Sequence, residues 1–276
     1  MSYVFLPDQR YRMPTHFGPS LGPRQGLDGR RYAGINGPKD LAISAAFQAQ
    51  ASQLEAFLPP GFYLREPNRV YLSFCYATEI EWLAGRGYNT FGVSIPVSYQ
   101  GKEDQVDGKL LLVLWENMAD PIITGREDLG FSKVYCELPE PQFIGENVLC
   151  RASWDGCQFA TLELTILKEV TPDKLPQPLP SAGTLHYRYI PKPSAPGEAD
   201  VEYAVLTPAA DPNVKVDQIM VAQGASGHFR QSSWEELPTL VHIVNALSTL
   251  ELGSCVEATL MRSHGGKDLS DQKILR

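Results

Sequence analysis

Residues 116 to 133 of this chain read ENMADPIITGREDLGFSK. A polar, glycine-containing turn ends here on a single lysine, Lys133, which has the apolar residues Phe131 and Val134 close by in the sequence. A lysine amine attacks a carbonyl carbon only when it is neutral, and an unperturbed lysine with a pKa of ~10.4 is almost wholly protonated at neutral pH. Lowering that pKa by ~3 to 4 units takes roughly 4 to 5.5 kcal/mol of differential stabilisation, which burial or a nearby cation supplies. The functional interpretation of the sequence therefore depends on Lys133.

This run resembles the signature of the acetoacetate decarboxylase superfamily, which reads Pro-Ile-x-x-Gly-Arg-Glu-x-x-Gly-Phe/Tyr-Pro-Lys. The final lysine of that signature forms a Schiff base with a ketone, and acetoacetate decarboxylase is itself a standard example of a lysine activated by a neighbouring cation. A second lysine usually follows the nucleophile in the family, whereas Val134 follows Lys133 here. The resemblance thus assigns the nucleophile to Lys133, and the missing second lysine favours desolvation as the cause of a lowered pKa. The alternative is a lysine that reaches solvent from a strand edge.

The resemblance extends to both sides of the run. Residues 87 to 101, GYNTFGVSIPVSYQG, are similar to the family's Gly-x-Tyr-x-Glu segment and the strand after it, and residues 54 to 62, LEAFLPPGF, to its short helix before a proline turn. Weaker similarity is found at residues 187–191 and 224–227. With these segments the resemblance covers the chain from about Leu41 to Met261. It implies an α+β fold: a mostly antiparallel β-sheet, cone-like or barrel-like, with a few short helices.

Three residues that act on the substrate in the family are absent. The decarboxylases are expected to bind the substrate carboxylate with an arginine and to place two glutamates beside the lysine. In this chain the arginine position falls near Lys39 or Asp40, the first glutamate near Ser73 and the second at Thr90. The resemblance therefore supports the fold and the lysine, while it argues against simple decarboxylation of acetoacetate.

Five further side chains are candidates for binding substrate. Tyr88, Thr90 and Ser73 lie on segments that line the pocket in the family, where a hydroxyl would bind a carbonyl, a hydroxyl or water; packing on a strand face is the alternative. Arg126 and Glu127 are neighbours at the start of an expected helix, where glutamate suits the helix dipole. For these two, a structural ion pair is the alternative to a contact with substrate.

Other catalytic motifs are sparse. Glu79 and Glu81 lie two apart in an insertion relative to the family, so either is a possible acid or base, with solvent exposure as the competing interpretation. The five histidines are far apart and show no metal-binding spacing, so we expect no metal. Neither a phosphate-binding Gly-x4-Gly-Lys-Ser/Thr loop nor a Gly-x-Ser-x-Gly elbow occurs, and we expect no cofactor.

Composition limits the partners and the compartment. The chain has 276 residues, 43% of them hydrophobic, and its 24 basic and 32 acidic residues give a net charge of −8 without a basic cluster, which disfavours nucleic acid and anionic membranes. Five scattered cysteines form no Cys-x-x-Cys pair, a pattern unlike a disulfide framework. The N-terminus lacks the features of a signal peptide and no apolar run reaches membrane-spanning length. The sequence thus predicts a cytoplasmic protein whose partner is a small carbonyl compound.

Three segments are expected along the chain. Residues 1–38, rich in Pro, Gly and Arg, predict an extended N-terminal arm that packs on the body or on a neighbouring subunit, and with the family's habit this suggests a homo-oligomer. Residues 39–262 form the acetoacetate decarboxylase-like domain, and 263–276 a loose, polar C-terminal tail. The residue patterns predict strands at 70–76, 91–99, 109–115, 148–153 and 159–167, and helices at 45–57 and 124–130. Residues 237–251 fit helical spacing, yet the family places strands nearby, so we expect a strand there.

These features predict a Schiff-base-forming lyase that acts on a keto acid or another carbonyl compound. An iminium ion on Lys133 eases cleavage or formation of a carbon–carbon bond. Without the arginine and the paired glutamates, aldol, retro-aldol or dehydration chemistry is the expected course, as in members that resemble aldolase-dehydratases. Two alternatives stay open: decarboxylation of a larger β-keto acid, and non-catalytic binding of a small carbonyl compound or hydrophobic metabolite.

Overall fold

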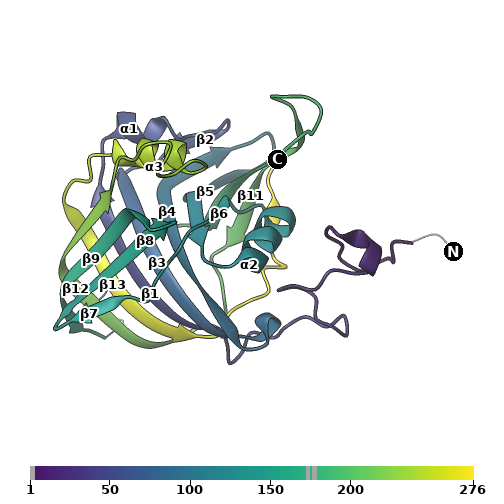
Figure 1. Cartoon of the computed structure of the whole chain (residues 1–276), viewed down its shortest axis with the longest axis horizontal. Coiled ribbons are helices and arrows are strands. Elements are labelled where there is room, and N and C mark those ends of the chain that lie inside the picture. The colour runs from purple at the N-terminus through teal and green to yellow at the C-terminus, as the bar shows by residue number, and fades with distance from the viewer. Residues whose placement is uncertain (1–3, 172–174, 176–178) are drawn as a thin grey trace.

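A computed structural model describes residues 4–171, 175 and 179–276. In this part of the chain, fourteen strands form one sheet that curves around a hydrophobic core (Figure 1). The strands are β1 (Lys39–Gln48), β2 (Phe62–Leu64), β3 (Arg69–Ile80), β4 (Arg86–Gln100), β5 (Gln105–Glu116), β6 (Lys133–Tyr135), β7 (Gln142–Ile144), β8 (Asn147–Trp154), β9 (Cys157–Glu169), β10 (Gly183–Pro191), β11 (Ala199–Pro208), β12 (Lys215–Phe229), β13 (Cys255–His264) and β14 (Lys273–Ile274). The helical elements are η1 (Thr15–Phe17), α1 (Ala51–Glu55), η2 (Glu81–Leu83), α2 (Ala119–Thr124), the π-helical turn η3 (Gly125–Leu129) and α3 (Val241–Ser248).

The strand order explains why distant segments meet. It runs β14-β11-β10-β5-β4-β3-β1-β13-β12-β9-β8-β7, with β2 added to β4 and β6 added to β5. Most neighbours are antiparallel, and β5 is parallel to both β10 and β6. The expected fold class, a large and mostly antiparallel sheet with few short helices, is confirmed. The central strands β1, β3, β4 and β5 thus lie side by side at the middle of the sheet.

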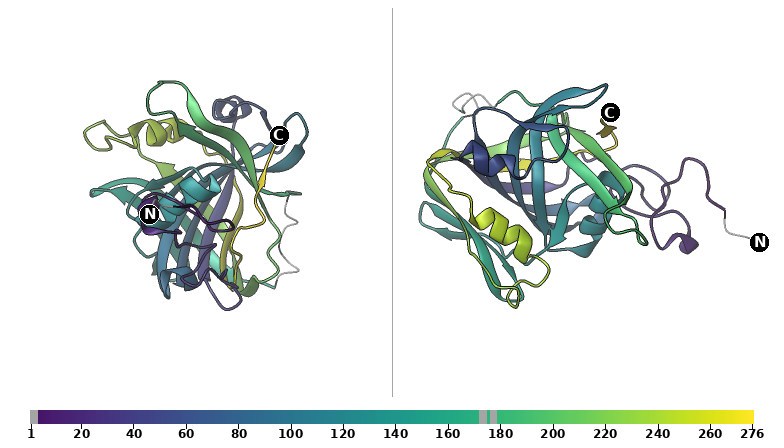
Figure 2. Two further views of the ribbon diagram at one scale, coloured as in Figure 1. Left: turned by 90° about the vertical axis from the view of Figure 1, so that its right-hand side faces the viewer. Right: turned by 90° about the horizontal axis from the view of Figure 1, so that it is seen from above.

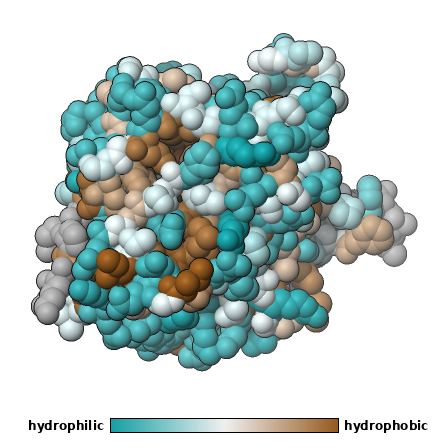
Figure 3. All heavy atoms as spheres, turned by 60° about the vertical axis from the view of Figure 1, so that its left-hand side comes forward, coloured by the Kyte–Doolittle hydropathy of each residue, from teal (hydrophilic) through white to brown (hydrophobic). Residues whose placement is uncertain are grey.

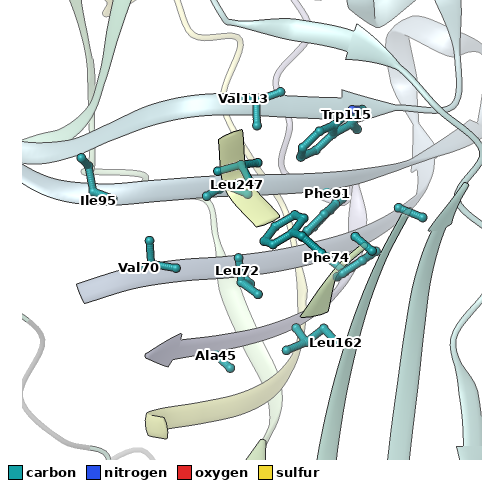
Figure 4. Close-up of a cluster of buried hydrophobic side chains, with 14 of the residues drawn as sticks. Ala45, Val70, Leu72, Phe74, Phe91, Ile95, Val113, Trp115, Leu162 and Leu247 are labelled. Atoms are coloured by element: carbon teal, nitrogen blue, oxygen red, sulfur yellow. The ribbon is translucent and has the colours of Figure 1, made fainter. Parts of the chain in front are cut away.

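Alternation along these strands separates a core face from a cavity face. Side chains one residue apart on a strand point to opposite faces. On one face Phe74, Phe91 and Trp115 are fully buried, and their rings stack with centroids 4.1 Å and 5.2 Å apart (Figure 4). The other face carries the polar side chains of the same strands, among them Thr90 and Glu116. One set of strands therefore holds both the core and the polar residues described below.

All five predicted strands are confirmed, since each lies within one of β3, β4, β5, β8 and β9. The expected helix at 45–57 is wrong in its first part, because Ile43, Ala45 and Phe47 alternate into the core as strand β1, and only Ala51–Glu55 is helical. The predicted helix at 124–130 corresponds to the end of α2 and to η3.

The expected strand within 237–251 is also wrong. This segment contains the helix α3, in which Val244 and Leu247 are buried with Leu240 just before them. Their spacing of three to four residues places them on one helical face, and the helix lays that face on the core beside β12. The helical periodicity was the correct signal.

The two ends of the chain differ in how they meet the body. The N-terminal arm leaves the body on the side where α2 lies (Figures 1 and 2), and its described part is held by ion pairs of Arg12 and Arg24 with Asp128 of η3. The C-terminal residues are not the loose tail expected, because β14 pairs with β11 and Leu275 is 5% exposed. An apolar residue near the chain end thus fixes this segment to the sheet.

The outer surface is mixed in character. Figure 3 shows the molecule turned so that the left-hand side of Figure 1 comes forward. On this face, hydrophobic residues form separate patches among hydrophilic ones. No helix in the described part of the chain is long and apolar enough to span a lipid bilayer.

Candidate active site

The segment between β5 and β6 places Lys133. The chain leaves β5, turns through α2 and η3, and returns as β6, which pairs parallel to β5 with Lys133 opposite Leu114. The π-helical turn ends at Gly130, whose φ of +80° is the left-handed conformation that glycine adopts without strain. Arg126 then donates a hydrogen bond from Nη1 to the carbonyl oxygen of Lys133 at 2.8 Å. These contacts fix the backbone of the lysine.

Gly125 of the signature makes room for the lysine side chain. A Cβ atom on Gly125 would lie 2.6 Å from Nζ of Lys133 and closer still to its Cδ and Cε. Such distances are shorter than real contacts allow, so the lysine passes directly over a backbone that has no side chain. The glycine of the Gly-Arg-Glu motif therefore has a steric explanation in this structure.

The amine of Lys133 is held by three groups. The residue is 6% exposed, and its Nζ lies 2.8 Å from Oε1 of Glu116 and donates to the carbonyl oxygen of Pro121 at 3.0 Å. It also lies 5.1 Å from the ring centroid of Phe131. Val134, by contrast, packs against the core cluster, so Val134 is not a residue that shields the amine. The three groups that contact the amine thus belong to β5, α2 and the turn before β6.

Glu116 is the site residue that sequence reasoning missed. It is 1% exposed at the end of β5, on the face opposite Trp115, and its Oε2 has no hydrogen-bond partner in the described structure. Burial raises the pKa of Glu116, and the charge of Lys133 opposes that change. Burial likewise lowers the pKa of Lys133, with Glu116 opposing. Both shifts favour a neutral amine and a neutral acid relative to the same groups in water.

The amine reaches the wall of a cavity of about 270 Å³. Strands β1, β3 and β4 supply one wall through Asp40, Cys75 and Thr90, and α2 supplies Pro121 and Thr124 beside Lys133. Further lining comes from η2 and from two segments near the ends of the chain, within residues 23–38 and 266–269. A Cβ on Gly34 or Gly37 would collide with a backbone carbonyl oxygen, that of Gly266 or Glu79 respectively. Close backbone contact therefore brings both ends of the chain to the cavity.

Burial shifts the pKa of two polar side chains on the cavity wall, Asp40 and Tyr88. Burial raises the pKa of Asp40 to about 6, and a hydrogen bond with the thiol of Cys75 opposes this. Burial, followed by the charge of Glu116, raises the pKa of Tyr88. The pKa of the Asp40 carboxyl group is thus raised to about 6, while Tyr88 stays a neutral hydroxyl.

The structure brings together only some of the candidates from the sequence. Tyr88 and Thr90 line the cavity with Lys133, and Glu81 lies on the same lining. Ser73 shares the cavity face of β3, but its hydroxyl is 2.6 Å from that of Ser44 and it does not line the cavity. The sequence alone did not reveal that the hydroxyl of Ser73 has Ser44 as its hydrogen-bond partner.

The remaining charged candidates lie outside the cavity lining. Arg126 is exposed apart from its bond to Lys133, and Glu127 contributes its backbone carbonyl as an acceptor for Arg188. The described structure contains no ion pair between Arg126 and Glu127, so that alternative is not supported. Glu79 forms an exposed ion pair with Lys39 at 2.7 Å. Arg126 therefore positions the lysine backbone in this structure.

His186 is a second buried polar residue near the lysine that the sequence did not single out. It is fully buried on β10, with its ring 4.1 Å from that of Phe131 and its Nε2 2.9 Å from the hydroxyl of Thr207. Burial, followed by the charge of Lys133, lowers its pKa to about 3. The imidazole is therefore neutral and forms part of the packing behind the site. Among the described residues no group of three or more His, Cys, Asp or Glu side chains is arranged to hold a metal ion.

Comparisons with known proteins agree with this architecture. A comparison with curated proteins finds no match. Among solved structures, acetoacetate decarboxylase from Legionella pneumophila superposes with a TM-score of 0.65 at 16% identity, covering 92% of this chain and 94% of that one. The enduracididine biosynthesis enzyme MppR, bound to the condensation product of pyruvate and imidazole 4-carboxaldehyde, gives 0.60 at 16% identity, covering 92% and 97%. An acetoacetate decarboxylase-like enzyme from Sphingomonas wittichii RW1 gives 0.58 at 16% identity, covering 91% and 97%.

At these identities the structures show a shared fold. The sequence evidence is separate, since the model of the acetoacetate decarboxylase (ADC) family matches residues 12–261. That match includes Lys133 and nearly the whole sheet. This chain belongs to the acetoacetate decarboxylase family.

Proposed function

We propose that this protein is a lyase in which Lys133 forms an imine with an aldehyde or ketone and the derived enamine undergoes aldol, retro-aldol or dehydration chemistry. The observation that carries the proposal is the state of Lys133: a buried amine on a cavity wall, 2.8 Å from a buried carboxyl group, with its pKa lowered by burial. A neutral amine in contact with a cavity is what imine formation requires.

The first half of the reaction follows from the Lys133–Glu116 pair. Glu116 accepts a proton from the ammonium group, which leaves the amine free to attack the carbonyl carbon. The carbinolamine that forms then takes the proton back on its hydroxyl and loses water, giving an iminium ion opposite the Glu116 carboxylate. Two nitrogen protons thus leave in the departing water: one passes through Glu116, and the other moves from nitrogen to oxygen when the carbinolamine forms.

The second half uses the iminium ion as an electron sink. Loss of a proton from the neighbouring carbon, or cleavage of a bond to it, leaves the electron pair in an enamine. The enamine carbon can attack an aldehyde carbon, and the new alkoxide takes up a proton; loss of water from that adduct and hydrolysis of the imine release an unsaturated product. Asp40, Tyr88 and Thr90 lie on the cavity wall for contacts with the second carbonyl group. MppR, which holds a product of this kind of condensation, is a fold relative of the chain.

Decarboxylation of a β-keto acid is the weaker alternative. It needs a cation to hold the substrate carboxylate, and the arginine that the family uses for this has no counterpart in the lining of the cavity. A non-catalytic binder would need neither a neutral lysine nor the Glu116 contact.

Reductive trapping tests the proposal. The protein is incubated with an aldehyde or ketone and borohydride, and peptides are mapped by mass spectrometry. We expect a reduced adduct on Lys133. Lys109 is a matched control, because burial also lowers its pKa while its amine lies over the ring of Tyr71, away from the cavity. Equal labelling of both lysines, or none on Lys133, would remove the basis for imine catalysis.

A further inference from the structure

The charges around the cavity are unbalanced. Three acidic side chains, Asp40, Glu81 and Asp268, belong to its lining, and Glu116 lies behind the lysine. The lining includes two cationic residues, Lys133 and Lys267, and no arginine or histidine. A carboxylate on a substrate would therefore meet more negative than positive groups.

The amines of both lysines in the lining already have partners. Lys133 contacts Glu116 at 2.8 Å. Lys267 directs its Nζ to the carbonyl oxygens of Pro208 and Ala210, at 2.6 and 2.9 Å, and to Asp271 at 2.7 Å. An ammonium group has three N–H donors, so these contacts use all the donors of Lys267. It has none left for an anion in the cavity.

Three arginines of the N-terminal arm are also paired. Arg12 and Arg24 lie 3.0 Å and 3.8 Å from Asp128, and Arg31 lies 3.7 Å from Asp268. None of the three arginines lines the cavity. The guanidinium groups of these three arginines are thus engaged by acidic groups of the protein.

Asp40 differs from the other acidic residues of the lining. Asp268 has the ion pair with Arg31 and a bond from the backbone N–H of Ser270, and Glu81 accepts a long bond from the N–H of Gly34. For Asp40 the described structure gives no ion pair, and the one partner is the thiol of Cys75, a weak donor. Asp40 therefore offers a half-buried carboxyl group with unused acceptor capacity to the cavity.

We infer that this cavity takes an aldehyde or ketone that carries no carboxylate and that presents a hydrogen-bond donor, such as an amide, hydroxyl or ammonium group, to Asp40. This narrows the expectation from sequence, which included keto acids. The covalent step of the inference rests on the imine chemistry proposed above; the preference for charge rests on the cavity alone.

Acetoacetamide and acetoacetate make a matched pair for the test. They have the same number of heavy atoms and the same ketone, but the amide is neutral and donates hydrogen bonds where the acid is an anion. Each is incubated with wild-type protein and cyanoborohydride at pH 8, and adducts on Lys133 are counted by mass, including the acetone adduct that acetoacetate would leave after loss of carbon dioxide. We expect labelling by the amide to be about tenfold faster or more, since a like charge in a partly desolvated site is strongly disfavoured.

Two variants locate the cause of that preference. Asp40→Asn removes the charge at constant size and should reduce the ratio of the two labelling rates to about threefold or less. Glu79→Gln is the control, because Glu79 is an exposed acid near the end of the neighbouring strand β3 and outside the lining; it should leave the ratio unchanged. Equal labelling of wild type by both compounds, or a ratio that Asp40→Asn does not change, would overturn the inference.

Calorimetric titration without reductant separates this inference from the proposed function. Tighter binding of acetoacetamide than of acetoacetate supports the charge preference even if neither compound labels Lys133, an outcome that would overturn the imine chemistry alone. Equal binding, or tighter binding of acetoacetate, would overturn the charge preference whatever the labelling shows.

Discussion

The two faces of strands β3, β4 and β5 are made in different ways. On the core face, Phe74, Phe91 and Trp115 stack on one another, and each is fully buried by its neighbours in the sheet. On the cavity face, Thr90 and Glu116 occupy the alternate positions, and the cavity is completed by α2 and both ends of the chain. The core face stabilises the fold through buried area, whereas the cavity face holds polar groups whose burial costs free energy unless they are paired. We therefore expect substitutions on the two faces to affect different properties.

The largest effect is expected at the cavity face, from Lys133→Ala. This variant should lose imine formation completely, while its circular dichroism and melting temperature stay close to wild type. The fold should survive because Glu116, left without its cationic partner, can be protonated in its buried position. Adduct formation that persists in Lys133→Ala would assign the nucleophile to another residue.

Substitutions on the core face should reduce the stability of the fold. Phe91→Ala removes the middle ring of the stack and should lower the free energy of unfolding by about 3 to 5 kcal/mol. Thr90→Ala, one position away on the cavity face, should change it by less than about 1 kcal/mol. Urea denaturation of both variants measures the difference, and comparable losses of stability would contradict the division into two faces.

Glu116→Gln sharpens the comparison, because it keeps the shape of a buried residue and removes its charge and proton. The carboxylate raises the pKa of Lys133, so its removal should lower that pKa and shift the pH midpoint of imine formation downward. The maximal rate should fall about 10² to 10³-fold through loss of proton transfer. Trapping rates measured from pH 5 to 10 separate the two effects. A midpoint that moves upward would mean that Glu116 does not act on the lysine by its charge.

The smallest effect is expected from Gly125→Ala. The added methyl group would collide with the Lys133 side chain, so the amine must move from its contacts with Glu116 and Pro121. Trapping should slow by about tenfold or more, as for a displaced catalytic group. Gly156→Ala is a control glycine, since a Cβ there meets no atom within 4 Å; its φ is +78° while that of Gly125 is −66°, so the control variant carries more backbone strain than Gly125→Ala and no steric clash. Equal rates in the two variants would refute the steric role of Gly125.

The sequence was sufficient for the fold class, and it singled out Lys133, the proposed nucleophile, before the cavity was known. The Gly-Arg-Glu-x-x-Gly-Phe-x-Lys run placed Lys133, and alternating apolar residues located strands such as β4 and β5. These signals are local, because a strand pattern and a turn motif each depend on a few consecutive residues. For helix α3 the local helical spacing indicates the correct structure, whereas the strand expected from the family resemblance is wrong.

The rest of the site could not be predicted because it depends on long-range pairing. Glu116 opened the signature run, yet only the parallel pairing of β6 with β5 brings it to the lysine. Asp40 reaches the cavity through the pairing of β1 with β3. His186 packs behind the site, against Phe131, through the pairing of β10 with β5. The contributions of residues 23–38 and 266–269 need both chain ends to fold back on the body. None of these pairings leaves a mark in the local sequence.

The central claim is that burial makes Lys133 a neutral amine in contact with its cavity, and the pH dependence of reductive trapping tests it most directly. The neutral fraction of an amine rises with pH and reaches one half at its pKa. Because burial lowers the pKa of Lys133, trapping on this residue should reach half its maximal rate at a pH below the ~10.4 of an ordinary lysine. Exposed lysines of the same protein, followed in the same mass spectra, supply the reference. A midpoint for Lys133 that coincides with theirs, or lies above it, would contradict the account.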